Sequence, residues 1–383
     1  MREIKAIIDS YQQIIEAGKK SVLATVVHVE GSSYRRPSAR MLVDENGITT
    51  GAISGGCLEG DALRKALYAL VKKKNTLITY DTSDEEDAIV GAQLGCNGII
   101  QVLFEPIDEQ DENNPISLLK QAVGKKKACV LVSLFDLKNK KGEQLGTSLL
   151  VADAVTGAIE NQTLSERVIE DANEVINARM CLFREYVDGK THQNVFIEYF
   201  APPVSLVIVG AGNDVQGLAK MAETLGWNMY VVDGRPTHAK QERFAPSCQV
   251  IVSTPEAILD NIPIDDRTAF VLLTHNYNYD LAVLKCLLDY DMIPYIGILG
   301  PKKKFRRMLA DLNEEGINIS KEDMEKIFAP VGLEIGAETP EEIAISILSE
   351  IKAVLSEVQG GSLRNKEKPI HSDDNTQFDT VQL

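Results

Sequence analysis

Apolar side chains follow a helical spacing at the start of the chain and then strand-like runs through its first half. The opening residues 2–18 predict an amphipathic helix whose apolar face holds Ile4, Ile7, Ile8, Tyr11, Ile14 and Ile15. Short apolar runs then predict strands over 21–29, 39–44, 48–53, 76–80, 99–105, 127–135, 147–151 and 192–200. Asn46-Gly47 is a hairpin turn signal between two of them, and residues 57–73 favour a helix. We therefore expect residues 1–200 to form an N-terminal mixed α/β domain.

The pattern changes after Ala201-Pro202-Pro203, which we interpret as a domain boundary. Buried-looking strands now alternate with helical segments, at 204–209, 229–232, 249–252, 268–273 and 293–298. This alternation predicts a Rossmann-like, doubly wound parallel sheet over residues 201–357. Its last helix, 339–357, begins with Thr339 as N-cap and Pro340 at the first helical position. Residues 358–383 are polar and unpatterned, which predicts a disordered tail.

Composition narrows the class of protein. The 383 residues carry a net charge of −16, which argues against nonspecific binding to nucleic acid or to an anionic membrane surface. No apolar run has the length of a membrane span, and the N-terminus lacks the apolar core of a signal peptide. The six cysteines show neither paired nor iron–sulfur spacing, so we expect free thiols in a cytoplasmic protein.

Two turn-forming clusters carry the chemistry of the first half: Gly31-Ser32-Ser33 and Gly55-Gly56-Cys57. Arg35, Arg36 and Arg40 lie between them, and the predicted hairpin brings the two clusters together. Glycines let backbone N–H groups approach a ligand, and arginines bind phosphate or carboxylate in a bidentate manner. A thiol beside cations at a helix start favours the thiolate form. The alternative interpretation is a simple Gly-Gly turn followed by a small buried cysteine.

The second half has polar groups where its strands end, the edge at which such sheets bind ligands. Gly210-Ala211-Gly212 follows the first strand, and Asp233 ends the second, as in a dinucleotide fingerprint. Val215 occupies the third glycine position, however, which weakens the prediction of NAD binding. His275 follows a later strand, and three roles are open for it: metal ligand, proton carrier or structural histidine. Lys302 opens a lysine-rich helix start that suits phosphate, or is simply solvated.

Both halves resemble the XdhC/CoxI family, the accessory proteins of molybdenum hydroxylases. The first block matches the family pattern at Gly31, Ser32, Arg35, Pro37, Ala39, Met41, Gly51, Gly55, Gly56, Leu58 and Glu59. Ser38 stands where the family usually has glycine. Further matching blocks, in the family's order, are Leu94–Gly98 with Cys96, Gly210–Gly212, Asp233-Gly234-Arg235, Glu242-Arg243-Phe244, Thr274-His275 with Asp280, Tyr295–Gly300 and Gly332–Ala344.

The resemblance implies a protein that binds the molybdenum cofactor (molybdopterin), protects it and delivers it to a xanthine dehydrogenase-type hydroxylase. It implies an apo-hydroxylase and a cysteine desulfurase as partners, and we expect a homo-oligomer. Cys57 is the first candidate ligand of molybdenum and Cys96 the second. The cofactor-binding candidates are Ser32, Arg35, Arg40, Gly55, Gly56, Cys57, Glu59, Cys96, Gly210, Gly212, Asp233, Arg235, His275 and Lys302.

Two other classes of function stay open at this point. One is an NAD(P)-dependent oxidoreductase that uses the Rossmann-like domain, and the other is a regulatory module that binds a nucleotide there. Val215, which replaces the third glycine of the fingerprint, counts against the oxidoreductase, and Asp233 counts for it.

Overall fold

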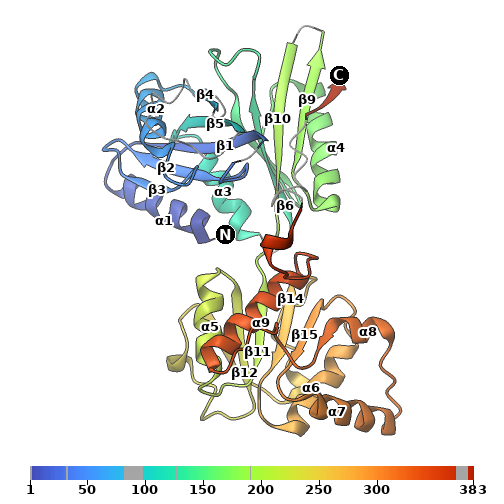
Figure 1. Ribbon diagram of the computed structural model, residues 1–383. Helices are drawn as coiled ribbons and strands as arrows, with labels where there is room; N and C mark the ends of the chain where they lie inside the picture. Colours follow the sequence, from blue (N-terminus) through green and yellow to red (C-terminus); the bar gives the residue numbers. More distant parts are fainter. Residues whose placement is uncertain (1, 32, 82–97, 126, 190, 368–377) are drawn as a thin grey trace. The chain divides into compact units, whose positions relative to one another are not determined.

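The computed structural model of the protein describes residues 2–31, 33–81, 98–125, 127–189, 191–367 and 378–383. The chain divides into two compact units. Unit 1 comprises the described residues of Met1–Pro202 and Lys368–Leu383, and unit 2 is Pro203–Glu367. Unit 1 is built around two sheets and unit 2 around one (Figure 1).

Unit 1 begins with a five-stranded antiparallel sheet in the order β3-β2-β1-β5-β4. Its strands are β1 (Ser21–Gly31), β2 (Arg40–Asp44), β3 (Thr49–Gly51), β4 (Thr76–Asp81) and β5 (Gly98–Pro106). The predicted hairpin is confirmed, since β2 and β3 pair around the turn that contains Gly47, whose φ is +82°. Helices α1 (Arg2–Glu16) and α2 (Glu59–Lys72) also agree with the sequence, although α2 starts two residues after Cys57.

A second sheet of unit 1 occupies the middle of the chain, with six strands in the order β17-β9-β10-β6-β7-β8. These are β6 (Cys129–Phe135), β7 (Gly146–Val151), β8 (Val155–Gly157), β9 (Leu182–Asp188), β10 (Thr191–Phe200) and β17 (Asp379–Gln382). Helices α3 (Pro115–Gly124) and α4 (Gln162–Ala178) complete the unit. Asn114 and Asn161 cap these two helices by accepting N–H bonds of the first turn.

The end of the chain differs from the sequence prediction of a disordered tail. Strand β17 pairs in parallel with β9, and Val381 packs against the core formed by the second sheet and α4. The ring of Phe378 lies 4.6 Å from that of His28 and 5.7 Å from that of Phe183. A few apolar residues in a polar segment are enough to form an edge strand when an aromatic cluster receives them.

The helices of unit 1 cover different faces of the first sheet. Ala62, Ala66 and Ala69 of α2 pack on the face that carries Val22 and Val26 of β1. The opposite face contacts α1, α3 and residues of the second sheet, including Leu131 and Phe200. The two sheets therefore share a core, and polar side chains between them are shielded from water.

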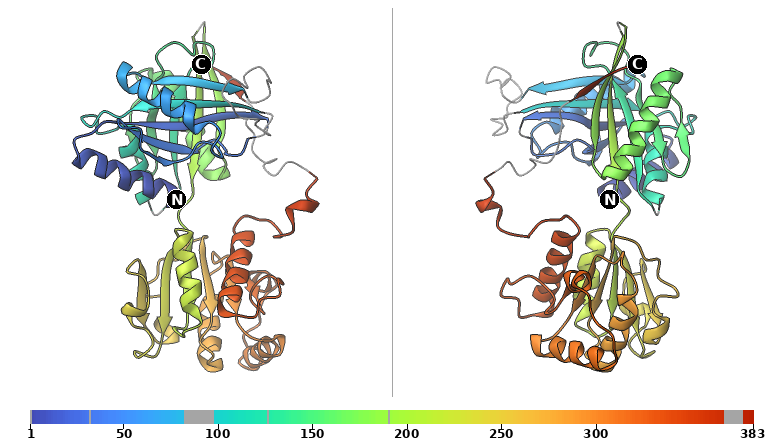
Figure 2. Two further views of the ribbon diagram at one scale, coloured as in Figure 1. Left: turned by 60° about the vertical axis from the view of Figure 1, so that its left-hand side comes forward. Right: turned by 90° about the vertical axis from the view of Figure 1, so that its right-hand side faces the viewer.

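Unit 2 is a parallel sheet in the order β13-β12-β11-β14-β15-β16, so the predicted fold class is confirmed. Its strands are β11 (Ser205–Val209), β12 (Asn228–Asp233), β13 (Cys248–Val252), β14 (Thr268–Leu272), β15 (Tyr295–Ile298) and β16 (Ile327–Phe328). One face is covered by α6 (Tyr277–Leu288) and α7 (Lys302–Glu314), as Figure 2 also shows. The other is covered by α5 (Val215–Thr224) and α9 (Pro340–Val354). The short helix α8 (Lys321–Lys326) precedes β16.

The start of α9 confirms the predicted cap. Thr339 and Glu342 form a reciprocal capping box, and Pro340 is the first helical residue. In the part of the chain that the structure describes, no helix combines the length and apolar character needed to cross a membrane.

Candidate functional site

The two loops of the first signature block converge in unit 1. The ring of Tyr34 lies over Gly55, because a Cβ placed on that glycine would be 3.2 Å from ring atoms. Arg35 donates to the carboxylate of Glu3 at 2.7 Å, and the same carboxylate accepts the N–H of Ala52 at 3.1 Å. We call the resulting group of residues 33–37 and 54–59 the two-loop site. The convergence expected from the hairpin is therefore confirmed.

Ser54 organises the second loop. Its hydroxyl accepts the N–H groups of Gly56 and Leu58 at 3.2 and 3.1 Å and donates to Glu59. Glu59 also accepts the N–H of Ser54 at 2.8 Å. Partial burial opposes ionisation, yet these hydrogen bonds hold the pKa of Glu59 below its usual value. Glu59 thus fixes the shape of the loop, which gives this candidate a positioning role.

Gly56 and Cys57 form the open part of the two-loop site. Gly56 is exposed with φ of +110°, and no described atom comes within 4 Å of a Cβ placed there. Cys57 is half-buried, and its Sγ lies 3.8 Å from Ser54 Oγ. Cys129 and Cys248 are buried, unlike Cys57. A ligand can thus approach a bare stretch of backbone next to a reachable thiol.

Arg40 does not face this opening, which corrects its assignment as an anion-binding residue. Its side chain is 2% exposed and makes a bidentate ion pair with Glu198 of β10, one arm at 2.9 Å. It also donates to the carbonyl of Ser38 at 3.1 Å. The charge of nearby Glu105 further favours the charged guanidinium. Arg40 therefore joins the two sheets, and we no longer count it among the ligand-binding residues.

Two candidates, Ser32 and Cys96, lie outside the described residues. Ser38, at the position where the family has glycine, is described and has φ of +82°. Its N–H donates to the carbonyl of Val26 at 2.9 Å, which closes a tight turn of the backbone. The turn holds Ser38 in the left-handed conformation, which glycine adopts most easily.

In unit 2, the acidic residue of the fingerprint is already bound to its own chain. Asp233 accepts the N–H of Ala211 at 2.8 Å, together with the backbone N–H, Nε and a terminal nitrogen of Arg235 at 2.7–2.9 Å. Burial acts to raise its pKa, but these bonds hold the pKa of Asp233 below its usual value. Arg243 donates to the carbonyl of Ala211. The Asp-x-Arg and Glu-Arg-Phe motifs thus fix the glycine loop.

A second internal group covers the glycine loop itself. The carboxylate of Asp214 folds over Gly212, where a Cβ would collide with Asp214 Oδ1. The other carboxylate oxygen lies 2.8 Å from Nε2 of His275, a residue held at φ of +56° just after β14. Gly210 has φ of +122° and packs against the carbonyl of Leu273. His275 is therefore tied to the glycine loop through Asp214.

At the lysine-rich start of α7, the lysine that contacts other side chains is not the one that the sequence predicted. Lys302 is exposed in the first turn of α7. Lys304 instead turns inward and donates to the buried carboxylate of Asp280 at 2.7 Å and to the carbonyl of Leu299 at 2.9 Å. Asp280 also accepts the hydroxyl of Thr274 at 2.6 Å. Residues two positions apart on a helix point to different sides, so Lys304 turns inward where Lys302 faces solvent. The sequence did not indicate Lys304, because its acidic partner Asp280 lies 24 residues earlier.

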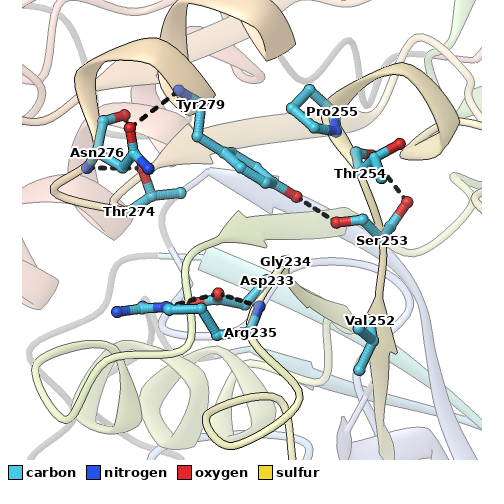
Figure 3. Close-up of a pocket in the computed structure, with 10 residues that line it drawn as sticks. All are labelled: Asp233, Gly234, Arg235, Val252, Ser253, Thr254, Pro255, Thr274, Asn276 and Tyr279. Carbon is cyan, nitrogen blue, oxygen red and sulfur yellow. Dashed lines mark hydrogen bonds and ion pairs between the residues drawn. The ribbon is translucent and has the colours of Figure 1, made fainter.

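A cavity of about 510 Å³ opens beside the ends of β12, β13 and β14 in unit 2. Figure 3 shows the ring of Tyr279 above the cavity, Arg235 at its lower left, and Val252 and Ser253 together at its right. Tyr279 donates its hydroxyl to the carbonyl of Ser253 at 2.7 Å, which fixes the ring. The sequence predicted a polar crevice here with Asp233 and Arg235, but it did not indicate Val252, Ser253 or Tyr279, because the signal at 252–255 is only a strand end.

The described side chains do not form a complete metal site. Within the described ranges, no group of three or more His, Cys, Asp or Glu side chains is arranged to hold a metal ion.

Comparisons with known proteins place the chain in a family. The description "XdhC and CoxI family" matches residues 14–81, and "XdhC Rossmann domain" matches residues 206–351. A Bacillus subtilis protein whose name describes a probable subunit of xanthine dehydrogenase is 31% identical over 88% of this chain and 94% of its own length. The chain belongs to the XdhC and CoxI family. The resemblance predicted from the sequence motifs is confirmed.

Two further similarities extend over most of the chain. A solved structure described as a xanthine dehydrogenase from Bacillus halodurans has a TM-score of 0.73 and 30% identity, over 93% of this chain and 98% of that one. The molybdenum cofactor insertion chaperone PaoD of Escherichia coli is 24% identical over 89% of this chain and 86% of its own length.

Proposed function

We propose that this chain binds the molybdenum cofactor at the two-loop site, protects it and delivers it to a xanthine dehydrogenase-type hydroxylase. The observation that carries the proposal is the open backbone at Gly56 beside the reachable thiol of Cys57. Family membership and the name of PaoD support the cargo. A cysteine desulfurase as sulfur donor, a homo-oligomeric state and action in the cytoplasm belong to the same proposal.

The residues of the site fit such a cargo in three ways. Gly56 is exposed and has open space where a side chain would stand, so a ligand can approach the backbone closely there. Arg35 is 29% exposed and supplies a planar cation for a phosphate, provided that it exchanges Glu3 for the ligand. The Cys57 thiol supplies a soft donor for molybdenum or its sulfur ligands. The cofactor brings the redox-active metal, and the chain holds and shields it.

The thiol is tested by replacing Cys57 with serine in full-length protein purified from molybdenum-replete cells. We expect Cys57→Ser to lose most of its bound molybdenum and pterin, measured by elemental analysis and by fluorescence of the released pterin. Cys286→Ser is the matched control, because that half-buried thiol lies on α6 of unit 2. Equal cofactor content in wild type and Cys57→Ser, with an unchanged melting temperature, contradicts the assignment.

The role of Arg35 is tested against that of its ion-pair partner. Losing a charge-assisted hydrogen bond to phosphate costs about 1.5–3 kcal/mol, so Arg35→Ala should bind free cofactor at least roughly tenfold more weakly. Glu3→Gln releases the guanidinium and should bind the cofactor as tightly as wild type or more tightly. If both variants merely lower the melting temperature and leave affinity unchanged, Arg35 is structural.

Delivery is tested by mixing cofactor-loaded chain with an apo-hydroxylase of the xanthine dehydrogenase type. We expect hydroxylase activity to appear faster than with the same amount of free cofactor, and Cys57→Ser to give no such acceleration. An NAD(P)-dependent oxidoreductase is not favoured, because Asp233 and the glycine loop are already engaged within the chain.

A further inference from the structure

The cavity of unit 2 has the size of a site for a small organic ligand. Its volume of about 510 Å³ lies within the range of roughly 300–1,000 Å³ seen in such sites. Its apolar wall is formed by Val252, Pro255 and Tyr279, and the side chain of Val252 is 51% exposed. Ser253, Thr254 and Asn276 add hydrogen-bonding groups. A rigid aromatic ring and a half-exposed valine offer flat apolar surface beside polar groups, which suits a planar heterocycle.

The neighbouring glycine loop, in contrast, is closed to phosphate. In a dinucleotide site the pyrophosphate lies over the glycines at the start of the first helix. Here the carboxylate of Asp214 takes that position, folded over Gly212 and held by His275 at 2.8 Å. A phosphate placed there would meet a negative charge and would have to displace this carboxylate.

The ribose position is occupied in the same manner. A free ribose diol is held by an acidic side chain at the end of the second strand. The corresponding Asp233 already accepts four N–H bonds, three of them from Arg235. Both groups that normally recognise a dinucleotide backbone are thus satisfied from within the chain, while the cavity next to them remains open (Figure 3).

We propose that this cavity binds an uncharged planar heterocycle, a nucleobase or nucleoside, and that Asp214 selects against ligands that carry a 5′-diphosphate. The ring contacts Val252, Pro255 and Tyr279, and polar edges meet the hydroxyl groups of Ser253 and Thr254. This site is independent of the two-loop site of unit 1 and does not require the molybdenum cofactor.

The test is calorimetric titration of the full-length protein with adenosine, guanosine, cytidine and uridine, with their 5′-diphosphates, and with NAD. We expect at least one nucleoside to bind, and its diphosphate to bind at least about threefold more weakly at low salt because of like-charge repulsion. Asp214→Asn keeps the shape and removes the charge. It should raise affinity for the diphosphate by about tenfold while changing nucleoside affinity less than about twofold.

A pair of matched variants locates the binding. Val252→Trp fills the cavity mouth and should abolish nucleoside binding. Val358→Trp, at a valine that is 59% exposed and does not line the cavity, should bind normally. The proposal is overturned by tighter binding of NAD or a diphosphate than of every nucleoside, by absence of nucleoside binding up to about 1 mM, or by equal behaviour of the two tryptophan variants.

Discussion

Replacing Arg40 by methionine is expected to destabilise unit 1 by about 3–5 kcal/mol, because it removes one partner of a buried ion pair. Methionine keeps much of the length of the side chain and none of its charge. The substitution leaves Glu198, which is 5% exposed, without its cation. It also removes the positive charge that favours ionisation of Glu105, a second buried carboxylate.

The loss of stability in Arg40→Met should depend on pH. Burial already raises the pKa of Glu105 to about 7, and without Arg40 this carboxyl group is easier still to protonate. Protonation relieves the uncompensated charge, so the loss of stability should be smaller at pH 5 than at pH 8. For units of this size, 1 kcal/mol corresponds to roughly 2–4 °C, which gives a fall in melting temperature of about 6–20 °C at pH 8.

The assay uses a natural reporter. Trp227 is the single tryptophan of the chain and lies in unit 2, so its fluorescence follows unit 2 alone, whereas calorimetry follows both units. We expect the calorimetric transition of unit 1 to fall in Arg40→Met and the tryptophan transition to stay in place. The double variant Arg40→Met/Glu198→Leu should recover much of the loss, because no buried charge is then left without its partner.

One result would refute this reasoning. If Arg40→Met melts within about 1 kcal/mol of wild type and loses cofactor affinity, Arg40 serves a ligand and not the contact between the sheets.

Three further changes test features of unit 1. Ser38→Gly should stabilise unit 1 by about 0.5–1 kcal/mol, because the left-handed conformation costs a non-glycine residue roughly 1–2 kcal/mol. The larger chain entropy of glycine in the unfolded state offsets part of this gain, and denaturant melts check the sign. Glu105 has a folded-state pKa above its unfolded value of 4.5, so its contribution is complete below pH 4.5 and disappears as pH rises through 7. Wild type should lose up to about 3 kcal/mol across that window and Glu105→Gln much less, measured by melts from pH 4 to 8. Phe378→Ala should weaken unit 1 by about 1–2 kcal/mol and speed hydrogen exchange in β17, and unchanged exchange would show that the aromatic cluster does not hold the strand.

Local signals in the sequence were sufficient wherever the structure is set by neighbours along the chain. The Asn46-Gly47 turn fixed the hairpin, and Thr339 with Pro340 fixed the start of α9. Alternation of strands and helices identified the parallel sheet of unit 2. In the hairpin and in the helix cap the deciding interaction spans only a few residues.

The sequence was not sufficient where a partner lies far along the chain. Arg40 looked like a ligand-binding arginine because its acceptor, Glu198, lies 158 residues later. Asp233 had the position of a ribose ligand, but the fingerprint does not reveal that Arg235 folds back onto it. Strand β17 has too few apolar residues to be recognised without the aromatic cluster that receives Phe378.

The position of β17 has a consequence for biosynthesis. Unit 2 is inserted into unit 1, because the chain leaves unit 1 at Pro202 and supplies its edge strand again at Asp379. At roughly 5–20 residues per second, a ribosome needs on the order of 10–35 s between these points. During that interval β9 lacks this partner, and unit 2 has time to fold first. A nascent chain of this protein therefore exposes an open sheet edge, which is a binding site for chaperones and an aggregation risk, until residues 379–382 emerge.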